Sequence, residues 1–175
     1  MNSYMSGAPV ESLISSLDSL DIPFERTTRE GFAETIRTRV GDPAVGVALD
    51  DFDVSLKGTG VDIDPTPAAL KAAYTGVTPA EFAVADYGSV VIPSTPDGCE
   101  LVSLFVDRHV AVLDGSDVLP TMDAAFDRFG ETFPEGKRSS IIATGPSATA
   151  DMGELVRGAH GPSDVQVVLL EGSDE

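Results

Sequence analysis

The spacing of apolar side chains along the chain predicts alternating helices and strands. A helical stripe runs through positions 10, 13, 14, 17 and 20, and it ends before Pro23, which cannot continue the hydrogen-bond ladder. A second helix is expected after Thr27 and Thr28, with Phe32 and Ile36 facing inward. The run 44–49 is almost entirely apolar, as is typical of a strand buried on both faces of a parallel sheet.

The rest of the chain continues this alternation. Three further helices are expected, over residues 68–74, 117–129 and 148–156. Strand-like runs occupy residues 81–86, 88–93, 101–106, 108–113, 139–143 and 165–170, and the third of these is expected to pair back as a hairpin. The pattern predicts an α/β fold, a mainly parallel sheet flanked by helices with an antiparallel hairpin in the middle. We expect residues 1–42 to form an N-terminal helical segment packed on one α/β domain, residues 43–175.

The charge balance is strongly acidic. The 175 residues include 29 Asp and Glu against 11 Lys and Arg, a net charge of −18 at pH 7. Such a surface repels nucleic-acid phosphates, so no nucleic-acid partner is expected. No apolar run approaches the roughly 18 residues of a membrane span, which predicts a cytoplasmic protein without membrane insertion. The acidic excess, with only three lysines, is interpreted as halophilic; the alternative is an ordinary acidic protein.

Sulfur and imidazole ligands are scarce. Cys99 is the only cysteine, which excludes an intrachain disulfide and an iron–sulfur cluster held by this chain alone, since a cluster needs about four thiolates. His109 and His160 are the only histidines, too few for a histidine-rich metal site. We therefore expect neither a metal nor a cofactor in this chain.

The stretch 141–151 is the most informative candidate site. An apolar strand runs into a Gly145–Pro146 turn and then into a predicted helix capped by Ser147 or Thr149. At the carboxyl edge of a parallel sheet, such a helix start offers free backbone N–H groups to an anion. Thr144, Gly145, Ser147 and Thr149 are thus predicted to bind an anion; the alternative is a capped helix without a ligand.

Four more residues are candidates. Arg157 and His160 lie in the turn after the predicted helix, where a guanidinium can hold a carboxylate and an imidazole can carry a proton. Asp86 interrupts two strands and is a candidate acid, base or nucleophile. His109 begins an apolar strand and either faces the ligand or is a buried structural residue. The alternatives are that Arg157 forms a surface ion pair, that His160 is an exposed turn histidine and that Asp86 is an ordinary turn aspartate.

Five ordered motifs resemble those of one protein family. They are Gly76-Val77-Thr78, the segment Ala83–Val91, His109-Val110-Ala111-Val112, the segment Thr144–Asp151 and Gly158-Ala159-His160-Gly161-Pro162. Followed by Val167-Val168-Leu169-Leu170, they resemble the LUD-domain family of lactate utilization protein C over roughly residues 45–172. The Glu-Thr-Gly-Thr usual in that family stands here as Asp86-Tyr87-Gly88-Ser89, and its Ser-Arg-Thr as Ser147-Ala148-Thr149.

The resemblance implies a fold and a role. The fold would be similar to that of the sugar-phosphate isomerase and CoA-transferase group. The role would be a non-redox component of L-lactate oxidation to pyruvate, with iron–sulfur clusters in separate partner proteins and with lactate, pyruvate or phosphate as the small anion. The alternatives are a stand-alone enzyme acting on a sugar phosphate or CoA thioester, with Asp86 and His160 catalytic, and a regulatory or assembly module. The sequence leaves catalysis by this chain and homo-oligomer formation open.

Overall fold

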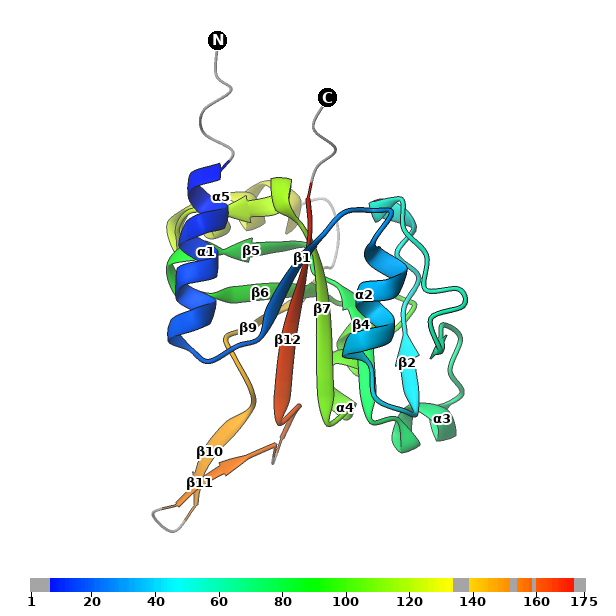
Figure 1. Cartoon of the computed structure of the whole chain (residues 1–175). Helices are drawn as coiled ribbons and strands as arrows, with labels where there is room; N and C mark the ends of the chain where they lie inside the picture. Colours follow the sequence, from blue (N-terminus) through cyan, green and yellow to red (C-terminus); the bar gives the residue numbers. More distant parts are fainter. Residues whose placement is uncertain (1–6, 134–138, 152–153, 159, 172–175) are drawn as a thin grey trace.

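Two sheets, five helices and a projecting hairpin make up the part of the chain that this computed structural model describes, residues 7–133, 139–151, 154–158 and 160–171 (Figure 1). The helices are α1 (Gly7–Ser19), α2 (Phe32–Arg39), α3 (Pro67–Ala72), α4 (Cys99–Phe105) and α5 (Met122–Thr132). Short 3₁₀ turns lie at η1 (Asp50–Phe52), η2 (Ala85–Tyr87) and η3 (Gly115–Asp117).

The main sheet has six parallel strands in the order β1-β12-β7-β4-β2-β3. In chain order these are β1 (Phe24–Thr27), β2 (Ala44–Gly46), β3 (Val61–Asp62), β4 (Thr75–Pro79), β7 (Arg108–Asp114) and β12 (Asp164–Leu170). Because β7 and β12 are buried on both faces, their apolar residues run on continuously instead of alternating with polar ones. The expected α/β fold with a mainly parallel sheet is confirmed.

The second sheet has the order β8-β5-β6-β9, and β5 and β6 form its antiparallel hairpin. Its strands are β5 (Phe82–Val84), β6 (Ser89–Pro93), β8 (Val118–Leu119) and β9 (Ser140–Ala143). Phe129 of α5 packs on Phe82, with ring centroids 5.3 Å apart. On the main sheet, α2 covers one face with Phe32 and Ile36, while α1 and α4 lie on the other.

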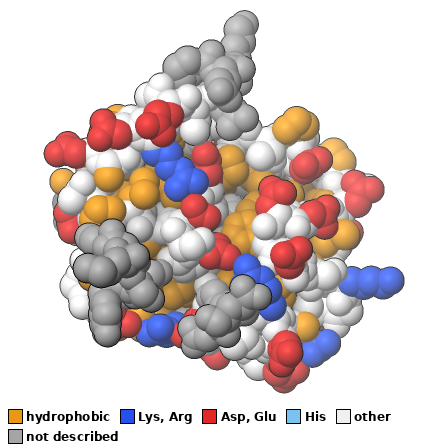
Figure 2. Space-filling model, turned by 90° about the horizontal axis from the view of Figure 1, so that it is seen from above, with side chains coloured by type: hydrophobic (Ala, Val, Ile, Leu, Met, Phe, Trp, Pro, Cys, Tyr) orange, Lys and Arg blue, Asp and Glu red, His pale blue; other side chains and the backbone are white. Residues whose placement is uncertain are grey.

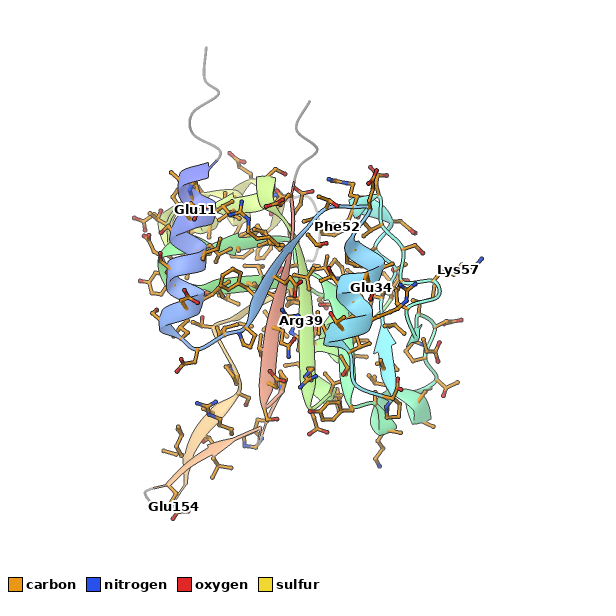
Figure 3. The ribbon with its side chains drawn as sticks, viewed as in Figure 1. Glu11, Glu34, Arg39, Phe52, Lys57 and Glu154 are labelled. Atoms are coloured by element: carbon orange, nitrogen blue, oxygen red, sulfur yellow. The ribbon has the colours of Figure 1, made fainter. Side chains whose placement is uncertain are left out.

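A two-stranded hairpin projects from the body of the molecule (Figure 1). It consists of β10 (Ala148–Asp151) and β11 (Glu154–Arg157), paired antiparallel with Ala148 opposite Arg157. Leu155 is 68% exposed, and Glu154 lies far from the two sheets in Figure 3. The predicted helix over 148–156 is therefore wrong; its residues 152–153 lie outside the described ones.

Three other local predictions were wrong. Residues 101–106, expected as a strand, belong mostly to α4, because Cys99, Val102 and Val106 are buried at helical spacing. Strand β1 was not predicted, although it lies in the segment 1–42 expected to be helical; residues 1–6 of that segment lie outside the described ones. Helix α5 begins at Met122 rather than at 117, and its Phe126 is 61% exposed.

Candidate functional site

A cavity of about 300 Å³ opens at the root of the hairpin. Its walls come from α4, from the first residues of β7 and β12, from the loop after β9 and from the turn before β12. The lining residues are Ile92, Ser103, Leu104, His109, Ile141, Ala143, Thr144, Gly145, Pro146, Ser147, Ala148, His160, Gly161, Pro162 and Val165. We call this space the hairpin-root cavity.

Hydrogen bonds hold the loop 144–147 against the turn 160–162. The Ser147 amide donates to the Pro162 carbonyl at 2.8 Å, and the Gly158 amide donates to the Ser147 carbonyl at 2.9 Å. The hydroxyls of Ser89 and Thr144, 2.7 Å apart, tie the same loop to β6. Two sequence motifs that lie apart along the chain thus form one wall of the cavity.

This geometry corrects the anion-binding mechanism predicted from sequence. No helix follows the loop, since β10 begins at Ala148, and the Ser147 amide is already used by Pro162. The cavity also lies at the amino edge of the main sheet, beside the first residues of β7 and β12, and not at the carboxyl edge. A ligand here would meet hydroxyls and imidazoles rather than a helix N-terminus.

His109 forms a neutral wall of the cavity. It is 2% exposed, and its Nε2 lies 2.9 Å from the hydroxyl oxygen of Thr78. Desolvation by burial lowers the pKa of His109 to about 4, so the imidazole is uncharged at neutral pH. His109 is therefore a buried, hydrogen-bonded residue that also lines the cavity, and its role toward a ligand stays a prediction.

The lining differs in charge from the rest of the surface. Among the described residues it contains no Asp, Glu, Lys or Arg. The opposite, carboxyl edge of the main sheet holds a second cavity lined by Asp51, Glu81, Asp114 and Asp117. Figure 2, which views the molecule from above, shows acidic side chains spread over that end. A small anion is therefore repelled less at the hairpin root than at the edge where parallel sheets usually bind ligands.

The structure brings five of the eight predicted site residues together: His109, Thr144, Gly145, Ser147 and His160. Thr149 and Arg157 lie on the hairpin, outside the lining, and are paired with Val156 and Ala148 in the β10–β11 register.

Asp86 and Cys99 also lie outside the cavity. Asp86 is exposed in η2, which packs against α1. Cys99 is buried at the start of α4, and burial raises the pKa of its thiol, as expected for a passive cysteine.

Sequence reasoning missed the contribution of α4. Ser103 and Leu104 line the cavity, and the Ser103 hydroxyl donates to the Glu100 carbonyl at 2.8 Å. Assigning 101–106 to a strand hid these residues. In the structure Cys99, Val102 and Val106 are buried on one face of the helix, but the apolar run 101–106 does not single out that face in the sequence.

The described ranges lack two kinds of feature. They contain no group of three or more His, Cys, Asp or Glu side chains placed to hold a metal ion. They also contain no helix with the length and apolar character needed to cross a bilayer.

Fold and cavity together define a class: an α/β protein with a six-stranded parallel sheet, a smaller second sheet and an uncharged pocket at its amino edge. The LUD domain family model matches residues 47–170. The chain belongs to the LUD-domain family, as its motifs suggested.

Curated relatives match part of the chain. Lactate utilization protein C of Bacillus subtilis is 34% identical over 102 residues, which cover 56% of this chain and 42% of that protein. The protein of the same name from Geobacillus thermodenitrificans is 28% identical over 132 residues, 73% of this chain and 52% of the relative. The matches thus span about half or less of the relatives' length.

A solved structure supports the fold. A DUF162 family protein from Deinococcus radiodurans superimposes with a TM-score of 0.71 over 95% of this chain and 98% of that one, at 18% identity. The likeness covers both sheets and shows the fold alone.

Proposed function

We propose that this chain is a non-redox component of an L-lactate utilization system and that it binds lactate or pyruvate in the hairpin-root cavity. The observation that carries the proposal is the convergence of His109, Thr144, Ser147 and His160, from three separate family motifs, on one uncharged pocket. Relatives named lactate utilization protein C match 56% and 73% of the chain.

The chemistry of the lining suits a three-carbon acid. The hydroxyls of Thr144 and Ser147 can donate to a carboxylate, and the exposed imidazole of His160 can accept the proton of a substrate hydroxyl. Leu104, Ile92 and Val165 supply an apolar wall for a methyl group. The cavity thus offers a partner to each part of lactate, and its volume of about 300 Å³ is ample for the molecule.

In this proposal, the electrons of lactate oxidation pass to another protein. Conversion of the alcohol to the ketone of pyruvate releases two electrons and two protons, and this chain has one cysteine. Four thiolates, the usual set for an iron–sulfur cluster, are therefore not available in the chain. Separate iron–sulfur partner proteins fit this limit, and the role of this subunit is then to bind and orient the substrate.

L-Lactate is expected to raise the thermal unfolding temperature of the wild-type chain in concentrated KCl. Ligand at a hundredfold excess over its dissociation constant stabilises the folded state by about 2.7 kcal/mol. His160→Gln and Thr144→Val should reduce this shift, because both side chains line the cavity. Thr149→Val is the matched control, since Thr149 lies on the hairpin outside the lining and should leave the shift unchanged.

Two results would contradict the proposal. One is a wild-type chain that gains no stability from lactate or pyruvate. The other is turnover of a sugar phosphate or an acyl-CoA by the isolated chain, which would favour the stand-alone enzyme. Co-purification of iron–sulfur proteins with this chain from the native cell tests the partner assignment separately.

A further inference from the structure

Thr78 belongs to the family motif Gly76-Val77-Thr78, yet it does not line the hairpin-root cavity. It lies in β4, where the parallel register with β7 sets Gly76 beside His109. Thr78 is two residues further along the strand, so it lies on the same face of the sheet as the imidazole. Its hydroxyl oxygen is 2.9 Å from His109 Nε2. Thr78 can therefore act on the cavity only through His109.

The hydrogen bond between these two side chains fixes the position of the imidazole proton. Because burial lowers the pKa of His109 to about 4, the ring carries a single N–H at neutral pH. Thr78 is 0% exposed, and His109 is the one hydrogen-bond partner of its hydroxyl among the described residues. If the hydroxyl accepted a proton from Nε2, its own buried proton would have no acceptor, which is costly. The hydroxyl therefore donates to Nε2, and the ring proton lies on Nδ1.

Nδ1 is the nitrogen that His109 presents to the cavity. No described residue forms a hydrogen bond with it, and the only fully buried side-chain nitrogen or oxygen without a partner in the described ranges is Gln166 Oε1. Nδ1 therefore keeps some accessible surface. The surface that His109 keeps, 2% of the residue, lies at the cavity that it lines. The N–H at Nδ1 is thus a donor available to a ligand.

We propose that Thr78 positions His109 as a neutral Nδ1–H donor, and that this donor selects acids with an acceptor oxygen on the carbon next to the carboxylate. The inference rests on the proposed function, since it names what the same cavity selects. In that binding mode Thr144 and Ser147 hold the carboxylate from the loop after β9, and His109 meets the C2 oxygen from β7. A keto oxygen and a hydroxyl can both accept this hydrogen bond, whereas the ammonium of an α-amino acid cannot.

The selectivity is measured by calorimetric titration of the intact chain in concentrated KCl with pyruvate, L-lactate and L-alanine. These three acids differ chiefly in the group on C2, which is a keto oxygen, a hydroxyl or an ammonium. Alanine is expected to bind at least about tenfold more weakly than pyruvate, because its ammonium faces the Nδ1–H group. The charge of −18 on the chain repels an anion more than a zwitterion, so charge alone gives no preference for pyruvate.

Nitrogen-15 NMR of the ligand-free chain at pH 7 tests the tautomer, because protonated and unprotonated ring nitrogens resonate far apart. The chain has two histidines, so His160→Gln leaves His109 as its only imidazole. In this background we expect the proton on Nδ1, a mixture of both tautomers with Thr78→Val, and a return to Nδ1 with Thr78→Ser. Thr75→Val is the matched control, since Thr75 is buried in the same strand but its hydroxyl donates to the Gly41 carbonyl at 2.8 Å.

The same variants separate pyruvate from lactate. Thr78→Val should weaken pyruvate binding about fivefold, the size of one lost hydrogen bond, and lactate binding less than about twofold, because a hydroxyl can also donate to an unprotonated Nδ1. Thr75→Val should leave the ratio of the two affinities unchanged.

Four results would overturn the inference: a ring proton on Nε2 in the ligand-free chain, an unchanged tautomer in Thr78→Val, equal weakening of both acids by that variant, or alanine binding as tight as that of pyruvate. A wild-type chain that binds neither acid contradicts the proposed function and with it the selectivity, whereas the spectrum decides the positioning of His109 by Thr78 without any ligand.

Discussion

Acidification from pH 7 to pH 4 is expected to reduce the free energy of unfolding by about 3 kcal/mol through His109 alone. The pKa of the buried imidazole falls from 6.5 to about 4 in the folded state because of desolvation. Between these values the unfolded chain binds a proton that the folded chain excludes. The contribution is therefore complete above pH 6.5 and is lost as the pH falls through this window.

The measurement is chemical denaturation at several pH values for the wild type and for His109→Gln. Glutamine cannot titrate and keeps an amide beside the Thr78 hydroxyl, which lies 2.9 Å from His109 Nε2. The carboxylates titrate in both proteins, so their effect cancels in the difference between the two curves. Curves that stay parallel between pH 7 and pH 4 would show that His109 is protonated equally in both states.

Gly76→Ala is expected to destabilise the fold by about 3 kcal/mol, through overpacking. Gly76 lies in β4, where an added Cβ would stand 2.7 Å from the Val102 carbonyl oxygen and 2.9 Å from Val102 Cγ1. Because the nearest atom belongs to the backbone of α4, the whole helix has to shift to make room for the added methyl group. Because Ser103 and Leu104 of α4 line the hairpin-root cavity, the substitution should also weaken lactate binding.

Gly130→Ala is the matched control for this prediction. Gly130 lies within α5, and no atom lies within 4 Å of an added Cβ. Alanine has the higher helix propensity, so this variant should be as stable as the wild type or slightly more stable. Urea denaturation of the three proteins is the measurement, and equal midpoints for Gly76→Ala and the wild type would show that α4 yields without cost.

The sequence predicted a helix or strand correctly where the apolar residues follow either the helical spacing or an unbroken run. Helix α1 and strands β7 and β12 have their expected places, because each shows a stripe or run that only one structure can bury. The prediction failed at residues 101–106, where Leu101, Leu104 and Phe105 are apolar yet more than a third exposed. An apolar run of this kind does not reveal which of its residues face the core.

The sequence indicated several residues that share the cavity, but not the local structure that places them there. The loop 144–147 and His160 do share a cavity, but the expected helix N-terminus is a hairpin in which Ala148 faces Arg157. Residues 148–151, Ala-Thr-Ala-Asp, alternate apolar and polar side chains over only four positions, which is too short to distinguish a strand from the start of a helix. The pairing with β11 is a tertiary outcome that local propensity does not encode.

The placement of β12 between β1 and β7 bears on synthesis at the ribosome. In the main sheet, β1 pairs with β12 alone, and Phe24 meets Val167 across a long stretch of chain. A nascent polypeptide that has completed β7 still lacks the strand that joins β1 to it. The main sheet is therefore complete only after translation has passed Leu170. Until then the edge of β7 that pairs with β12 is exposed, and other molecules in the cell have to cover it.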